Sequence, residues 1–136
     1  MNNRHTILIV DDDMDDREIL QDAFASISDN SHDYVFIENG DKLIEYLQNS
    51  DATTFPSLIL LDLNMPGKDG REALKEIKTH EDFRTVPVVV FTTSSSQRDK
   101  LTSYSLGANC FVTKPDTFNK LAELARAISH LWLSRN

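Results

Sequence analysis

The chain has 136 residues, of which 40% are hydrophobic and 26% charged, so it has the size of one compact domain with a buried core. Its 14 Lys and Arg against 22 Asp and Glu give a formal net charge of -8, which repels nucleic-acid phosphates and argues against nucleic-acid binding. No apolar run approaches the ~20 residues that cross a bilayer. Without a secretory signal pattern, and with Cys110 as the single cysteine, the chain is expected to be cytoplasmic, with no membrane partner.

Five short apolar segments have the composition of strands that are buried on both faces of a sheet. They lie at residues 6–10, 34–38, 58–61, 88–91 and 110–113. Segments with helical spacing lie between them, and a last helix is expected from about Asp116, whose carboxylate can cap it, to about Leu133. Regular alternation of strands and helices predicts an α/β fold with a doubly wound, five-stranded parallel sheet, (βα)5, in a single domain over residues 1–136.

Polar residues follow four of the predicted strands at their carboxyl ends, where α/β sheets place functional groups. Several carboxylates gathered in one crevice repel one another unless a cation binds, and a site made only of oxygen ligands favours Mg2+. We interpret Asp11 and Asp12 as metal ligands on this basis. The acidic residues that follow them fit a solvated loop before a helix N-terminus. The residues at the strand ends are Asp11, Asp12 and Asp13; Asp62; Thr92 and Thr93; and Thr113, Lys114 and Pro115.

Asp62 follows four apolar residues, and the next helical segment begins too late, near Gly70, for Asp62 to cap it. A carboxylate in this position can act as a nucleophile and form an acyl phosphate. Such chemistry also needs a hydroxyl and an ammonium group near the phosphoryl oxygens. Thr92 and Lys114 supply these two groups at the ends of other strands.

Taken in order, these residues resemble a response-regulator receiver domain, the phosphoaccepting half of two-component signalling. The motifs are ILIVDDD, LILLDLNMPGKDG, VVVFTT and CFVTKP. The resemblance, which extends to chemotaxis regulators, implies a flavodoxin-like receiver fold and a phosphoacceptor at Asp62. It also implies Mg2+ bound by Asp12, Asp62 and the backbone carbonyl of Asn64, with Asp11 acting through water. Thr92 and Lys114 would bind the phosphoryl group, and a cis peptide bond before Pro115 would set the position of Lys114.

The segment TTSSSQRDKLTSYSLGANCFVTKP is more specific, since it resembles stand-alone receivers that serve bacterial phytochrome-type histidine kinases. This resemblance implies no output domain, a phytochrome-type histidine kinase as donor and a separate downstream protein partner. It implies a phosphoacceptor with self-catalysed phosphotransfer and slow autodephosphorylation, and therefore no enzyme in the usual sense. The signal would pass through the surface of the fourth helix, fifth strand and last helix. At the family's aromatic switch position stands Phe111, for which switching and simple core packing are equal alternatives.

The last helix carries more apolar surface than one packing face needs. Its apolar residues fill an arc of roughly 200°, against the ~100° of a helix buried on one side. Packing on the sheet accounts for part of this arc and leaves Leu124 and Leu131 over. We expect a homodimer through this face, and two tolerated surface leucines are the alternative.

Two other functions fit parts of the pattern. A haloacid-dehalogenase-type phosphatase would use Asp11 as its nucleophile, with Asp13 completing a DxD signature. The third position of that signature should be Thr or Val, however, and is Asp15. A phosphorylation-independent interaction module would keep the fold without the chemistry, but the acceptor and metal residues are complete.

Overall fold

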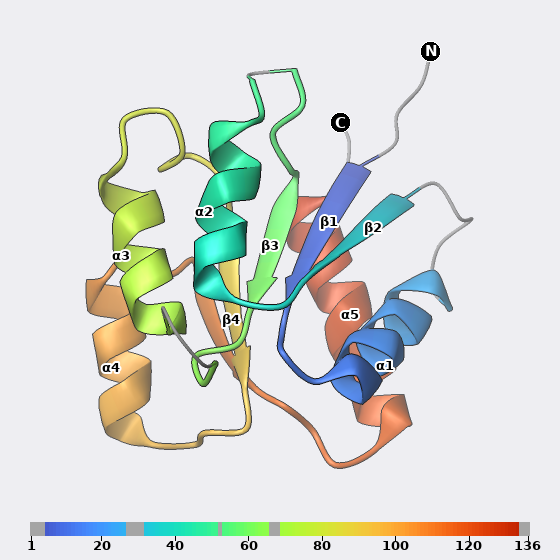
Figure 1. Cartoon of the computed structure of the whole chain (residues 1–136). Coiled ribbons are helices and arrows are strands. Elements are labelled where there is room, and N and C mark those ends of the chain that lie inside the picture. The colour runs from blue at the N-terminus through green and yellow to red at the C-terminus, as the bar shows by residue number, and fades with distance from the viewer. Residues whose placement is uncertain (1–4, 27–31, 52, 66–68, 134–136) are drawn as a thin grey trace.

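The computed structural model describes residues 5–26, 32–51, 53–65 and 69–133. Five strands and five helices alternate along the chain, as predicted (Figure 1). In order they are β1 (His5–Val10), α1 (Met14–Ala25), β2 (His32–Ile37), α2 (Gly40–Gln48), β3 (Leu58–Leu61), α3 (Gly70–Thr79), β4 (Val88–Thr92), α4 (Gln97–Ser105), β5 (Cys110–Thr113) and α5 (Phe118–Trp132).

All strands are parallel, and their order in the sheet is β2-β1-β3-β4-β5. Helices α1 and α5 lie side by side on one face, and α2, α3 and α4 cover the other (Figure 1). This is the doubly wound sheet that the sequence predicts. The order reverses between β1 and β3, and such a switch point is where open α/β sheets form their functional sites.

The period-two geometry of the strands divides the core between the two faces of the sheet. In β1, Ile7 and Ile9 pack with α1 and α5, whereas Leu8 and Val10 pack with α2 and α3. All four side chains are 0–1% exposed. A continuous apolar run is therefore required here, because both faces of the strand are covered.

The expectation that all five strands are buried on both faces is correct for the central strands β1, β3 and β4 and wrong for β2 and β5. The last two form the sheet edges, where fewer neighbours cover each side chain. Next to one edge, α4 buries only Ser103 among its residues. Its apolar residues Leu101 and Tyr104 are 60% and 43% exposed, so α4 presents apolar side chains to solvent.

The N-cap of the last helix lies one residue later than expected. Thr117, not Asp116, is the N-cap, since its hydroxyl oxygen accepts the Lys120 backbone N–H at 3.2 Å. Both residue types suit a cap, and the structure uses the one adjacent to Phe118. Helix α5 ends at Trp132, followed by the C-cap Leu133, close to the predicted end.

Helix α5 packs on the sheet through Leu121, Ala125 and Ile128, which are buried. Leu124 is half-buried, and Leu131 is 67% exposed. The predicted excess of apolar surface on this helix is therefore present, chiefly at Leu131. Across the described residues, none of the helices combines the length and hydrophobicity needed to cross a bilayer.

Candidate functional site

Three carboxylates meet at the carboxyl ends of β1 and β3. Because β3 lies beside β1, the backbone N–H of Asp62 donates to the carbonyl of Val10 at 3.0 Å, which places Asp62 next to Asp11 and Asp12. One carboxylate oxygen from each Asp can be chosen so that all three lie within 4.8 Å of one another. Asp11 and Asp62 are 2% and 9% exposed, whereas Asp12 faces solvent. The sequence-predicted cluster is thus assembled, and Asp12 is its solvent-exposed member.

Burial sets the electrostatics of this cluster. Loss of water raises the pKa of both Asp11 and Asp62 above the ordinary carboxyl value, although Lys114 acts in the opposite direction on each. The hydrogen bonds available to the carboxylates are few. The Asp13 N–H donates to Asp11 at 2.9 Å, and the Asn64 N–H reaches Asp62 at a long 3.4 Å. Two buried negative charges are therefore only partly compensated by the protein itself.

Lys114 supplies the positive charge at the centre of the site. Its Nζ lies 2.8 Å from Asp11 Oδ2, 2.8 Å from Asp16 Oδ2 and 3.8 Å from Asp62 Oδ2. Burial lowers the pKa of this ammonium group, but the hydrogen bonds and charges of the carboxylates outweigh burial and raise its pKa above the ordinary value. Lys114 is therefore positively charged at neutral pH.

The expected cis peptide bond before Pro115 is wrong for this structure, since no cis bond occurs among the described residues. The trans form is the lower-energy isomer of an X–Pro bond by about 0.5–1 kcal/mol. The position of Lys114 is instead fixed by its backbone N–H, which donates to the Thr92 carbonyl at 2.7 Å. This bond extends the pairing of β4 with β5 past Thr113.

Thr92 ends β4 and is fully buried. Its Oγ1 accepts the backbone N–H of Ser94 at 3.3 Å, and a threonine hydroxyl can also donate its own proton. Thr93, the next residue, is exposed. Of the two threonines at this strand end, only Thr92 has the burial expected of a site residue.

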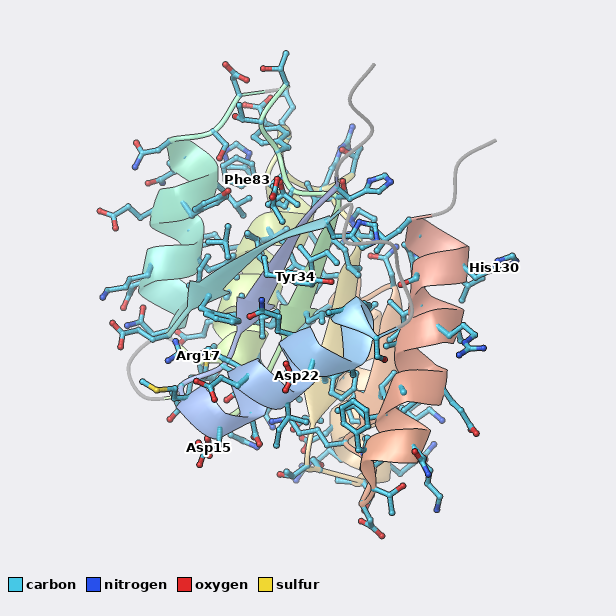
Figure 2. All side chains as sticks on the ribbon, turned by 90° about the vertical axis from the view of Figure 1, so that its right-hand side faces the viewer. Asp15, Arg17, Asp22, Tyr34, Phe83 and His130 are labelled. Carbon is cyan, nitrogen blue, oxygen red and sulfur yellow. The ribbon has the colours of Figure 1, made fainter. Side chains whose placement is uncertain are left out.

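The acidic residues after Asp12 divide into two roles. Asp13 is the N-cap of α1, and its Oδ1 accepts the N–H groups of Asp15 and Asp16 at 2.9 and 3.2 Å. Asp15 points away from the sheet (Figure 2). The prediction of an acidic loop that favours the helix N-terminus is confirmed for both. Asp16 differs, because it reaches Lys114, a contact that sequence reasoning missed.

Sequence reasoning also missed the role of Gly70 beside the site, although Asp69, a good N-cap residue, directly precedes it. Asp69 caps α3 in a capping box with Glu72, which fixes the start of the helix. The Gly70 N–H donates to the Leu63 carbonyl at 3.0 Å. A Cβ on Gly70 would lie 2.3 Å from the Asp62 carbonyl oxygen, so only glycine allows α3 to approach the strand end that carries Asp62.

Phe111, the predicted switch residue, is half-buried on β5 and packs against the core under α2 and α3. Its backbone N–H donates to the hydroxyl oxygen of Tyr104 on α4 at 3.1 Å. Far from this region, His130 projects outward from α5 (Figure 2) and takes no part in the site.

Comparison with known proteins identifies this arrangement. Residues 7–126 match the family described as response regulator receiver domain. The chain belongs to this family. The response regulator Rcp1 of Synechocystis is 37% identical over 97% of the chain and 91% of Rcp1. The probable methanogenesis regulatory protein FilR2 of Methanothrix harundinacea is 33% identical over 96% of the chain and 84% of FilR2.

Solved structures agree with the assignment. The phosphorylated cyanobacterial phytochrome response regulator RcpA has a TM-score of 0.87 and 37% identity, covering 96% of the chain and 95% of RcpA. The Mn2+-bound form of Rcp1 has a TM-score of 0.84 and 36% identity, covering 97% of the chain and 96% of Rcp1. The flavodoxin-like receiver fold and the place of the chain in two-component signalling, predicted from sequence, are confirmed, and neither alternative function is favoured.

Receiver domains are signalling proteins that interact with histidine kinases and downstream partners, are typically not enzymes, and bind a divalent metal ion at their acidic cluster. The residues present here fit such an ion. Asp11, Asp12 and Asp62 offer carboxylate oxygens, the ligands that Mg2+ and Mn2+ prefer. Burial raises the pKa of Asp11 and of Asp62, so a bound cation would favour the ionised form of both carboxylates.

Replacing Gly70 by Ala should disturb the site through the backbone of Asp62. We expect a loss of about 1–3 kcal/mol in the free energy of unfolding, because the added methyl group overpacks the contact, and weaker Mg2+ binding because Asp62 moves. Urea unfolding with and without Mg2+ measures both. Gly107→Ala is the control: Gly107 has φ +106° and lies away from the site, so this variant should lose stability while Mg2+ stabilises it as it does the parent.

Replacing Asp62 by Asn should stabilise the metal-free protein at pH 7. The pKa of Asp62 is higher in the folded than in the unfolded state, so its ionisation opposes folding above the folded-state pKa and the penalty fades as pH falls toward 3.8. We expect a gain on the order of 1 kcal/mol, or a rise of about 2–5 °C in Tm.

The measurement is thermal unfolding in EDTA across this pH range, with the exposed Asp82→Asn as control. A variant that is less stable than the parent at pH 7 would contradict the electrostatic description of the site. With Mg2+ present, the order should reverse if Asp62 is a metal ligand.

Proposed function

We propose that this receiver domain accepts a phosphoryl group from a histidine kinase on Asp62, in a Mg2+-dependent step, and passes the signal on by changed protein contacts. One observation carries the proposal: a buried carboxylate at the β1/β3 switch point lies within 4.8 Å of two further carboxylates and 3.8 Å from a lysine ammonium group. Of the three carboxylates, Asp62 is the one that both adjoins Lys114 and has a hydroxyl group, Thr92, at the end of the next strand.

In the proposed reaction an oxygen of Asp62 attacks phosphorus and the phosphorus–nitrogen bond to the kinase histidine breaks, leaving its electron pair on that nitrogen. Mg2+ held by Asp12, Asp62 and the Asn64 carbonyl, with Asp11 acting through water, would neutralise negative charge on the phosphoryl oxygens. Lys114 and the Thr92 hydroxyl would donate to the same oxygens. Phosphotransfer is then self-catalysed, because the receiver supplies every stabilising group.

Lys114 must change partners in this process. It begins bound to Asp11 and Asp16 at equal distances, and Asp16 is the more exposed of the two. The new phosphoryl oxygens are stronger acceptors than a solvated carboxylate, so the Asp16 contact is the one we expect to be given up. Slow autodephosphorylation would follow from water reaching Asp62 past the exposed Asn64 and the half-buried Ser94.

The signal would leave through α4, β5 and α5. Thr92 moves toward the phosphoryl group and vacates space into which Phe111 turns. The Tyr104–Phe111 hydrogen bond couples α4 to β5, and Leu101 and Tyr104 expose apolar surface on α4. A downstream protein that contacts this face would sense the change.

The donor and the mode of output also belong to the proposal. The similarity to RcpA, a cyanobacterial phytochrome response regulator, supports a phytochrome-type histidine kinase. Coverage of 91% of Rcp1 supports a receiver domain that acts in the manner of that response regulator. The single cysteine supports a cytoplasmic location, and the net charge of -8 supports a protein partner in place of nucleic acid.

Incubation with acetyl phosphate and Mg2+, followed by intact mass and peptide mapping, tests the reaction. We expect one phosphoryl group on Asp62, no labelling of Asp62→Asn or in EDTA, and slower labelling of Lys114→Ala. Labelling of Asp11 would instead favour the phosphatase alternative. A chain that takes up no phosphoryl group from either acetyl phosphate or a histidine kinase would be an interaction module.

We also propose that the protein forms a homodimer through Leu124 and Leu131 on α5. Leu131 is 67% exposed, and burying it against a second copy removes apolar surface from water. Sedimentation should show a dimer for the parent and a monomer for Leu131→Lys and Leu124→Lys. The equally apolar Leu101→Lys on α4, at 60% exposure, is the control and should stay dimeric. A monomeric parent at all concentrations tested removes this proposal.

A further inference from the structure

A polar bridge joins α3 to α4 beside the site. Arg71 Nη2 donates to Asp99 Oδ1 at 2.9 Å, and the hydroxyl of Ser94 donates to Asp99 Oδ2 at 2.7 Å. The side chains of Arg71 and Asp99 are 31% and 22% exposed. Both carboxylate oxygens are therefore engaged, one by each neighbouring segment, in partial shelter from water.

Both ends of this bridge are attached to residues of the site. Arg71 directly follows Gly70, which contacts the Asp62 carbonyl too closely to allow a Cβ. At the other end, the Ser94 N–H donates to Thr92 Oγ1 at 3.3 Å. The bridge thus runs from the strand end that carries Asp62 to the hydroxyl of Thr92, by way of α3 and the β4–α4 connection.

Further bonds make the β4–α4 connection one unit with Ser94. The Ser94 carbonyl accepts the Thr113 hydroxyl at 2.9 Å, and the Ser94 hydroxyl oxygen accepts the Ser96 N–H at 3.1 Å. Ser96 in turn caps α4 by accepting the Asp99 N–H at 3.2 Å. Thr92 and the first turn of α4 therefore cannot move without changing the surroundings of Ser94.

The charge on Asp99 is well supported in this arrangement. Hydrogen bonds from Ser94 and then from Arg71 hold the pKa of Asp99 below the ordinary value. An ionised carboxylate makes stronger bonds to both donors than a neutral one. The bridge is accordingly a charge-assisted link and not merely a contact of two exposed side chains.

We propose that Arg71 and Asp99 form a latch that holds the β4–α4 connection in its unphosphorylated position. The proposal rests on the proposed phosphorylation of Asp62. Movement of Thr92 toward a phosphoryl group there carries Ser94 with it, and Ser94 must then leave Asp99 or draw Asp99 away from Arg71. Contacts made in only one of two states bias the equilibrium toward that state. Arg71 and Asp99 are thus positioning residues that set how readily the phosphorylated conformation forms.

The test uses beryllofluoride with Mg2+ as a stable phosphoryl analogue, with calorimetric titration of the full chain. Arg71→Ala and Asp99→Ala should each bind the analogue about three- to tenfold more tightly than the parent, a range bounded by the ~1.4 kcal/mol of a tenfold change. The double variant should gain no more than Asp99→Ala alone, because Asp99→Ala already removes the bond to Arg71. Lys75→Ala is the control for Arg71→Ala, since Lys75 is exposed on the same helix and its removal changes the net charge by the same amount.

A second measurement distinguishes a latch from an ion pair that only stabilises the fold. The Arg71–Asp99 coupling free energy, from a double-mutant cycle on urea unfolding, should be present without the analogue and at least halved with it bound. A pair that only stabilises the fold would show the same coupling in both states. Arg71→Lys should bind the analogue with an affinity between those of Arg71→Ala and the parent. Asp99→Asn, which retains the shape of the side chain, should likewise have an affinity between those of Asp99→Ala and the parent.

Equal affinities for parent and variants, weaker binding by the variants, or a coupling unchanged by the analogue would each overturn the latch. A failure of the phosphorylation proposal would give a different result: the parent protein itself would carry no phosphoryl group on Asp62 after incubation with acetyl phosphate. If the parent labels and the variants bind the analogue no more tightly, the latch alone is wrong.

Discussion

The structure depends on the burial of two carboxylates at the ends of adjacent parallel strands. Asp11 and Asp62 follow β1 and β3, whose side chains are covered on both faces, so neither acid can turn to water as a surface residue would. One ammonium group, that of Lys114, lies close enough to offset them. With Asp12 the cluster holds three carboxylates beside one ammonium group, and this imbalance makes it receptive to a divalent cation.

The same constraint explains the surroundings of the site. Asp11 gains a hydrogen bond from the Asp13 N–H because Asp13 caps α1 immediately afterwards. Gly70 lets α3 pack against the carbonyl of Asp62, while the N–H of Asp62 is held by Val10 of β1. The rigid elements thus hold the carboxylates in place, while the bonds that can exchange partners are on Lys114 and in the β4–α4 connection.

Much of this arrangement follows from the sequence because parallel strands end at a common edge. Once ILIV, LILL, VVVF and CFVT are recognised as strands, Asp11, Asp12, Asp62, Thr92 and Lys114 must lie at that edge. The contacts of Asp16 and Arg71 could not be predicted, since their partners are 98 and 28 residues away and depend on how each helix is rotated on the sheet. Composition also could not distinguish the edge strands β2 and β5 from central ones. Asp116 and Thr117 are both good caps, and only the path of the chain after β5 selects between them.

One contact has a consequence for the life of the chain before any signal arrives. The bond between Lys114 and Asp11 joins residues that are 103 positions apart, so Asp11 is synthesised well before Lys114. A nascent or partly unfolded chain carries Asp11 and Asp62 without the ammonium group of Lys114 beside them. The charge balance of the acidic cluster is therefore completed only when β5, which leads into Lys114, has docked on β4.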